Sequence, residues 1–175
     1  HKRLAIEAGE HPTMNPIEYI LECINVFDDF DVFGHVDYIV RYGPTKAENY
    51  SYQKYQEILD EIIKTLISKN IGLELNTAGF KYGLVFPNPH MDILKRYREL
   101  GGEIITIGSD GHVPEHLAYD FHKVPNILKE CGFDYYTIFQ KRKAALSAKH
   151  HHGDGMPLIG NRLSPLHDAD QRGCV

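Results

Sequence analysis

Cysteine is scarce in this chain, and positive charge is not in excess. The three cysteines, Cys23, Cys131 and Cys174, lie far apart and match no metal-ligand spacing, so we expect ordinary thiols. Nineteen Lys and Arg stand against 24 Asp and Glu, which gives a net charge of −5 at pH 7. This balance lacks the clustered basic residues that binding to nucleic-acid phosphates requires. We therefore expect no nucleic-acid partner.

Long apolar runs are also missing. No segment approaches the roughly 20 apolar residues that cross a bilayer, and the first residues are polar where a signal peptide would be apolar. We therefore expect no membrane association and a cytoplasmic location. With 175 residues, of which 42% are hydrophobic, the chain is long enough for about one domain with its own core. Folding then requires neither disulfides nor a structural metal.

Hydrophobic periodicity predicts helices and strands that alternate along the chain. Helices are expected at 16–27, 52–69, 91–100 and 125–130, and strands at 31–35, 72–76, 103–108 and 135–139. The strands read as apolar, which favours parallel βαβ units covered on both faces. The fold class is α/β, and periodicity alone leaves a doubly wound sheet and a barrel both open.

The pattern changes near the C-terminus. From Ala144 onward, Gly, Pro, His and Asp are scattered without an apolar stripe. We therefore predict a domain over 1–143 and an irregular, disordered tail over 144–175. The run of three histidines at 150–152 belongs to this tail.

Two strand ends carry residues suited to chemistry. Gly34 to Asp37 close the first predicted strand, and Ser109 to His112 close the third. Asp110 and His112 are two residues apart, so both can project to one side, and a carboxylate beside an imidazole suits Zn, Mn or Fe. Asp-Gly-His is equally a turn sequence. His35 can likewise be a strand-end hydrogen-bond partner or a ligand.

Four segments carry a family resemblance. They read DDFDVFGHVDYIVRYGP at 28–44, LELNTAGFKY at 73–82, ILKRYRELGGEIITIGSDGH at 93–112 and GFDYYTIFQKRK at 132–143. In this order and spacing they resemble histidinol-phosphate phosphatases of the polymerase and histidinol phosphatase (PHP) superfamily. The similarity covers about residues 16–143.

The resemblance implies an α/β fold that is a partial, distorted β/α barrel of the TIM-like, PHP type. It also implies up to three divalent metal ions, Zn, Mn or Fe, at the C-terminal mouth of the strands. The expected reaction is hydrolysis of a small phosphomonoester by metal-bound hydroxide, with histidinol phosphate of histidine biosynthesis as the expected substrate.

The resemblance also assigns roles to individual residues. His35, Asp110 and His112 match metal ligands and catalytic positions of the family. Arg41 and Lys81 match basic positions that grip the substrate phosphate, and the alternative for each is an ordinary solvated cation.

The remaining polar candidates are open or assigned to support. His90 can cap the following helix or touch substrate, and a surface role is expected for His116 and His122. We assign Glu74 and Asn76 to support of the site before metal ligation.

One family motif is missing from the sequence. The superfamily begins with a His-x-His strand motif, and this chain has none outside the run at 150–152. The barrel is therefore expected to lack its N-terminal strands, which leaves an exposed sheet edge and invites a homo-oligomer or a separate N-terminal segment as partner. Three interpretations stay open: a histidinol-phosphate phosphatase, another PHP-type phosphoesterase, and a non-catalytic fragment or structural subunit.

Overall fold

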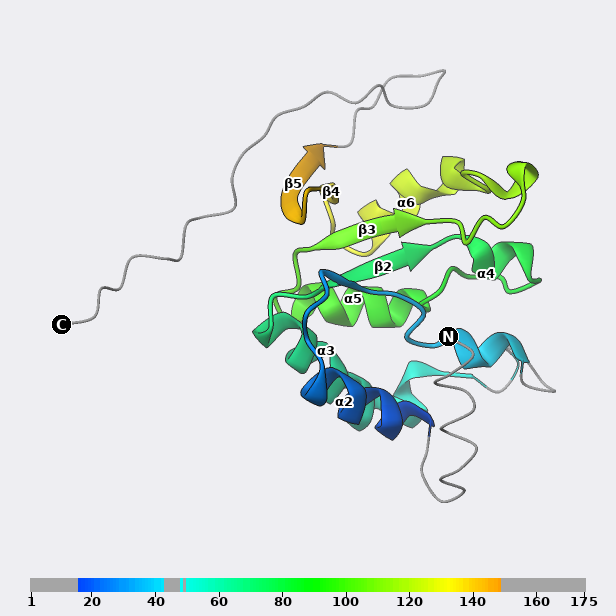
Figure 1. Ribbon diagram of the computed structural model, residues 1–175. Coiled ribbons are helices and arrows are strands. Elements are labelled where there is room, and N and C mark those ends of the chain that lie inside the picture. Colours follow the sequence, from blue (N-terminus) through cyan, green and yellow to red (C-terminus); the bar gives the residue numbers. More distant parts are fainter. Residues whose placement is uncertain (1–15, 43–47, 49, 149–175) are drawn as a thin grey trace.

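Helices and strands alternate along the chain in the computed structural model, which describes residues 16–42, 48 and 50–148 (Figure 1). The α-helices are α2 (Pro16–Val26), α3 (Gln56–Ser68), α4 (Ala78–Lys81), α5 (Met91–Glu99) and α6 (Val124–Glu130). The strands are β1 (Val32–Phe33), β2 (Gly72–Asn76), β3 (Ile105–Gly108), β4 (Tyr135–Gln140) and β5 (Lys143–Ala148). Short 3-10 helices lie at η1 (Tyr38–Tyr42), η3 (Tyr52–Tyr55), η4 (Pro114–His116) and η5 (Phe121–Lys123). In this part of the chain no helix combines the length and the apolar character that crossing a membrane demands.

A parallel sheet forms the centre of the structure. Its strand order is β1-β2-β3, and both neighbouring pairs are parallel. In the longer pair, Leu73 lies opposite Ile105 and Asn76 opposite Gly108. The predicted α/β class with parallel strands is confirmed, and the predicted strand at 72–76 matches β2 at both ends.

The hydrophobic core lies on one face of this sheet. Leu73, Leu75 and Ile105 are completely buried, and they pack with one side of α3 and of α5. The residues that share this core include Ile62, Ile63, Leu66, Ile93 and Leu94, all without measurable exposure. Burial of this apolar surface is the main stabilising contribution to the fold.

The other face of the sheet is polar. Side chains alternate along a strand, so Glu74 and Asn76 point away from the core, opposite Thr106 and Gly108 of β3. Glu74 and Thr106 are only half-buried. The expectation that these strands have two apolar faces is therefore wrong, because the face away from α3 and α5 carries the polar groups of the site.

The C-terminal strands differ from the prediction. β4 lies at the predicted place, but it pairs antiparallel with β5 in a separate two-stranded sheet. The irregular tail predicted from Ala144 is therefore wrong for residues 144–148, which belong to β5. The turn between the strands consists of Lys141 and Arg142, both with positive φ, where hairpin sequences usually have Asn or Gly. Residues 149–175 lie outside the described part of the chain.

Candidate functional site at the carboxyl edge of the sheet

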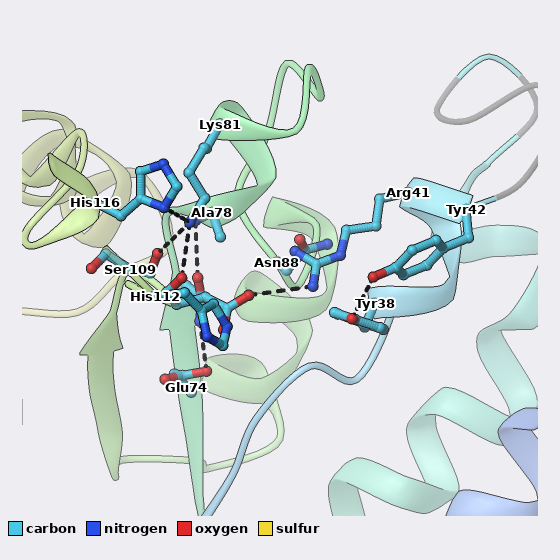
Figure 2. Close-up of polar contacts among 12 residues, drawn as sticks. Tyr38, Arg41, Tyr42, Glu74, Ala78, Lys81, Asn88, Ser109, His112 and His116 are labelled. Atoms are coloured by element: carbon cyan, nitrogen blue, oxygen red, sulfur yellow. Dashed lines mark hydrogen bonds and ion pairs between the residues drawn. The ribbon is translucent and has the colours of Figure 1, made fainter. Parts of the chain in front are cut away.

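Three loops leave the same edge of the sheet, because parallel strands end on one side. His35 follows β1, α4 follows β2, and the segment from Ser109 to His112 follows β3. Figure 2 shows side chains from these loops pointing toward one another. This edge is where ligands of parallel α/β proteins are bound.

Asp110 is at the centre of this group. Its Oδ1 lies 3.1 Å from His112 Nε2 and its Oδ2 lies 3.3 Å from Arg41 Nη2. The Asp110 side chain is 17% exposed and that of His112 is 76% exposed. The spacing Asp-x-His thus places a carboxylate and an imidazole side by side, as the sequence suggested.

Arg41 is a buried cation held between aromatic rings. Its side chain is 4% exposed, and its guanidinium carbon lies 3.6 Å from the centre of the Tyr38 ring and 4.3 Å from that of Tyr82. Cation–π attraction and the rings' bulk hold the guanidinium in place. Its Nε and Nη1 are buried without a hydrogen-bond partner among the described residues. A desolvated guanidinium with unused donors at this edge is suited to receive an anion.

Lys81 is the last residue of α4, and its ammonium contacts the loop after β3. Nζ donates to the carbonyl oxygen of Asp110 at 2.9 Å and to that of Ser109 at 3.3 Å. It also lies 3.4 Å from Nδ1 of His116. The sequence assigned His116 to the surface, and nothing in its spacing from His112 indicates this contact with Lys81.

Glu74 lies below this group on β2. Asn76 Nδ2 donates to Glu74 Oε2 at 3.1 Å, and Asn76 Oδ1 accepts from the Ala78 amide at 2.9 Å. A Cβ atom at Gly34 would lie 2.8 Å from Glu74 Oε2, and one at Gly108 would overlap Oε1. The carboxylate therefore fits between the ends of β1 and β3 because both carry glycine there.

His35 is placed differently from Asp110 and His112. Its φ is +63°, and its ring packs edge-on against Tyr38 with 5.0 Å between the ring centres. Within residues 16–42, 48 and 50–148, no three His, Cys, Asp or Glu side chains gather as a group that could hold a metal ion. The described residues thus supply the Asp110–His112 pair after β3, and His35 lies in the loop after β1.

The other two histidines named from the sequence have clear places. His90 is the N-cap of α5, where its Nδ1 accepts from the Asp92 amide at 3.2 Å, which is the capping alternative. His122 is 76% exposed and lies 4.0 Å from Asp120, in agreement with a surface role.

Asp37 is a buried carboxylate that sequence reasoning did not single out. It is 3% exposed, and it accepts from the His90 amide at 2.7 Å and from Asn88 Nδ2 at 3.0 Å. Burial raises the pKa of this carboxyl, against the opposing effect of these hydrogen bonds. Asp37 thereby fixes the loop after β1 to the segment before α5. Its place in the Gly34 to Asp37 motif was the one available signal.

Asp, His, Arg and Lys side chains thus lie at the carboxyl edge of a parallel α/β sheet, an arrangement of charges suited to anions or metal ions. Comparison with known proteins gives the family. The PHP domain model matches residues 14–78. Histidinol-phosphatase of Lactococcus lactis subsp. lactis is 34% identical over 134 residues, which cover 72% of this chain and 48% of the relative. The chain belongs to the PHP-domain family.

A further relative and a solved structure agree with this assignment. A probable histidinol-phosphatase of Thermotoga maritima is 35% identical over 114 residues, covering 65% of this chain and 46% of the relative. The crystal structure of the Lactococcus lactis subsp. lactis histidinol phosphate phosphatase, complexed with zinc, L-histidinol and phosphate, matches with a TM-score of 0.60 and 31% identity. That match covers 73% of this chain and 48% of the other. The chain thus spans about half the length of these relatives.

Proposed function

We propose that this chain provides part of a metal-dependent phosphomonoesterase that hydrolyses histidinol phosphate, with the groups for metal and phosphate at the carboxyl edge of its parallel sheet. Its fold would then be part of a distorted β/α barrel of the PHP type. The observation that carries the proposal is the buried Arg41 guanidinium, with unused donors, beside the Asp110–His112 pair. The names of the curated relatives support the reaction and the substrate.

Two of the described side chains at this edge are suited to bind a divalent ion, which is fewer than a complete set of ligands. Asp110 and His112 offer a carboxylate oxygen and an imidazole nitrogen, ligands suited to zinc, manganese or iron. We assign both to metal binding, and we assign His35 to a second ion of the same site. A divalent ion at such a site supplies charge that lowers the pKa of water and neutralises phosphoryl oxygens.

Arg41 is the cation of this edge that we assign to the phosphate. Arg41 is already desolvated and fixed between Tyr38 and Tyr82, so it loses little freedom when it binds two phosphate oxygens. Lys81 adds positive charge to the same edge, and a direct contact from its ammonium to phosphate is the role that the family resemblance implies.

The non-catalytic alternative has one observation in its favour. The described residues bring together only two of the expected metal donors, Asp110 and His112. We therefore expect the 175-residue chain to turn over histidinol phosphate slowly or not at all by itself, and binding is the more sensitive measurement.

The test measures binding of Mn²⁺, and then of inorganic phosphate at saturating Mn²⁺, by calorimetry. Asp110→Asn should weaken Mn²⁺ binding by about tenfold or more, because the amide lacks the ligand charge. Arg41→Ala should retain Mn²⁺ and weaken phosphate binding about tenfold, as expected for one lost charge-assisted contact. Arg142→Ala is the matched control, since this arginine lies exposed in the β4–β5 turn. Unchanged binding in both site variants would refute the proposed function.

A further inference from the structure

Three consecutive carbonyl groups at the end of β3 are bound by one short segment. The Thr77 amide donates to the Gly108 carbonyl at 2.9 Å. The Lys81 ammonium then donates to the next two carbonyls, those of Ser109 and Asp110, at 3.3 Å and 2.9 Å. The end of β2 and α4 therefore hold the backbone from which the Asp110 side chain projects.

Asp110 needs such support because of its backbone conformation. Its φ is +48°, in the left-handed region that glycine adopts freely and an aspartate adopts at a cost. The Asp110 carbonyl is bound by Lys81, while its carboxylate contacts Arg41 and His112. Fixing the carbonyl thus fixes the direction in which the carboxylate leaves the backbone.

The donors of Lys81 are all matched within the chain. An ammonium has three N–H groups, and Nζ has three acceptors within reach: the carbonyls of Ser109 and Asp110, and His116 Nδ1 at 3.4 Å. Binding a phosphate oxygen would require Lys81 to give up one of these contacts. Arg41, in contrast, has buried donors that no described residue uses.

We propose that Lys81 is a positioning residue that holds the Asp110 turn in the conformation needed for metal binding. This role rests on the proposed function, in which Asp110 is a metal ligand. It differs from the role of a phosphate ligand, and the two roles predict effects of opposite kind when the ammonium is removed.

The sign of the change in metal affinity separates these roles. A cation that is merely near a metal site repels the metal, so its removal should tighten Mn²⁺ binding. A positioning residue does the reverse, because without it the carboxylate is no longer held in place. Loss of a group that orients a metal ligand typically weakens metal binding about 10- to 100-fold.

The experiment compares the 175-residue chain with Lys81→Met, Lys81→Arg and Lys95→Met. Methionine keeps the length of the side chain without its donors, and arginine keeps both donors and charge. Lys95 is the control, since it lies on the surface of α5 and pairs with Glu130 of α6. The measurements are Mn²⁺ affinity, phosphate affinity at saturating Mn²⁺, and hydrogen exchange of the Thr77 amide, which reports on the bond to Gly108 without any metal.

For Lys81→Met we expect Mn²⁺ affinity at least about tenfold lower, faster exchange of Thr77, and phosphate affinity within twofold of the parent. Lys81→Arg should restore both changed properties, and Lys95→Met should match the parent.

Unchanged or tighter Mn²⁺ binding in Lys81→Met, with weaker phosphate binding and unchanged exchange, would overturn the positioning role. If the parent chain itself binds no Mn²⁺, the proposed function fails. In that case hydrogen exchange of the Thr77 amide still tests whether Lys81 holds the Asp110 turn. Faster exchange in Lys81→Met supports this role, and unchanged exchange overturns it.

Discussion

Gly79 lies in α4, two residues before Lys81, where the helix packs directly against another part of the backbone. A Cβ atom at this position would overlap the carbonyl oxygen of Phe86 and lie 3.0 Å and 3.1 Å from the carbonyl carbon and Cα of Pro87. Main-chain atoms cannot rotate away as the end of a side chain can. Gly79→Ala should therefore displace α4 from the segment at Phe86 and Pro87.

Two opposing contributions set the magnitude of this effect. Inserting one carbon atom into a packed contact destabilises a protein by about 1–3 kcal/mol. Alanine in place of a helical glycine stabilises the folded chain by about 0.5–1 kcal/mol, because alanine loses less backbone entropy on folding. Because the overlap is with main-chain atoms, the upper part of the first range, about 2–3 kcal/mol, applies. Gly79→Ala should therefore lower the free energy of unfolding by about 1–2.5 kcal/mol. At about 2–4 °C per kcal/mol for a chain of this size, this lowers Tm by roughly 2–10 °C.

Urea unfolding followed by circular dichroism measures the stability, and Mn²⁺ calorimetry measures the consequence for the site. Gly101→Ala is the comparison: its Cβ would meet no atom within 4 Å, but its φ of +97° also makes alanine unfavourable. Both variants should be destabilised, and only Gly79→Ala should also lose Mn²⁺ affinity, because α4 carries Lys81. A Gly79→Ala variant as stable as the parent would refute the tight packing of α4, and equal Mn²⁺ affinity in both variants would refute the link from α4 to the site.

Two other predictions concern stability. Asp60 accepts hydrogen bonds from Arg96 at 2.7–3.1 Å, and these bonds hold the pKa of this carboxyl below its usual value. Because the folded-state pKa is lowered, the stabilisation is present above the usual pKa of about 3.9 and is lost as the pH falls through the folded value. In urea titrations Asp60→Asn should cost about 1–3 kcal/mol at pH 7, and a cost that does not shrink below pH 4 would contradict this assignment. Lys141→Gly should raise the free energy of unfolding by up to about 1 kcal/mol, since Lys141 has a φ of +51° and glycine adopts that conformation freely; a lower Tm would show that the turn gains nothing from glycine.

Periodicity predicted four of the five α-helices of the described residues, and the three strands of the parallel sheet, but not the short helix α4. The apolar stripe of the second predicted helix corresponds to α3, in which Leu59, Ile62, Ile63 and Leu66 are buried. β2 begins at Gly72 and ends at Asn76 as expected, because an apolar run is bounded there by a helix stop and a polar turn. The spacing of Asp110 and His112 allowed their side chains to lie side by side, as they do, but it left an ordinary turn equally open.

Contacts that depend on the backbone could not be predicted in this way. Lys81 binds carbonyl oxygens, which every residue has, so no sequence pattern marks its partners. Arg41 was named through the family resemblance, and its place between Tyr38 and Tyr82 depends on the path of η1. β5 was missed because its turn has Lys141 and Arg142 where glycine or asparagine is usual.

The contact between Arg41 and Asp110 joins residues that are 69 positions apart in the chain. Closing so long a loop is entropically unfavourable until the intervening strands have paired, so we expect this contact to form late in folding. The site then has no independent stability: it exists only when β1, β2 and β3 are assembled together. A spectroscopic probe placed at this edge would report the cooperative folding of the whole parallel sheet.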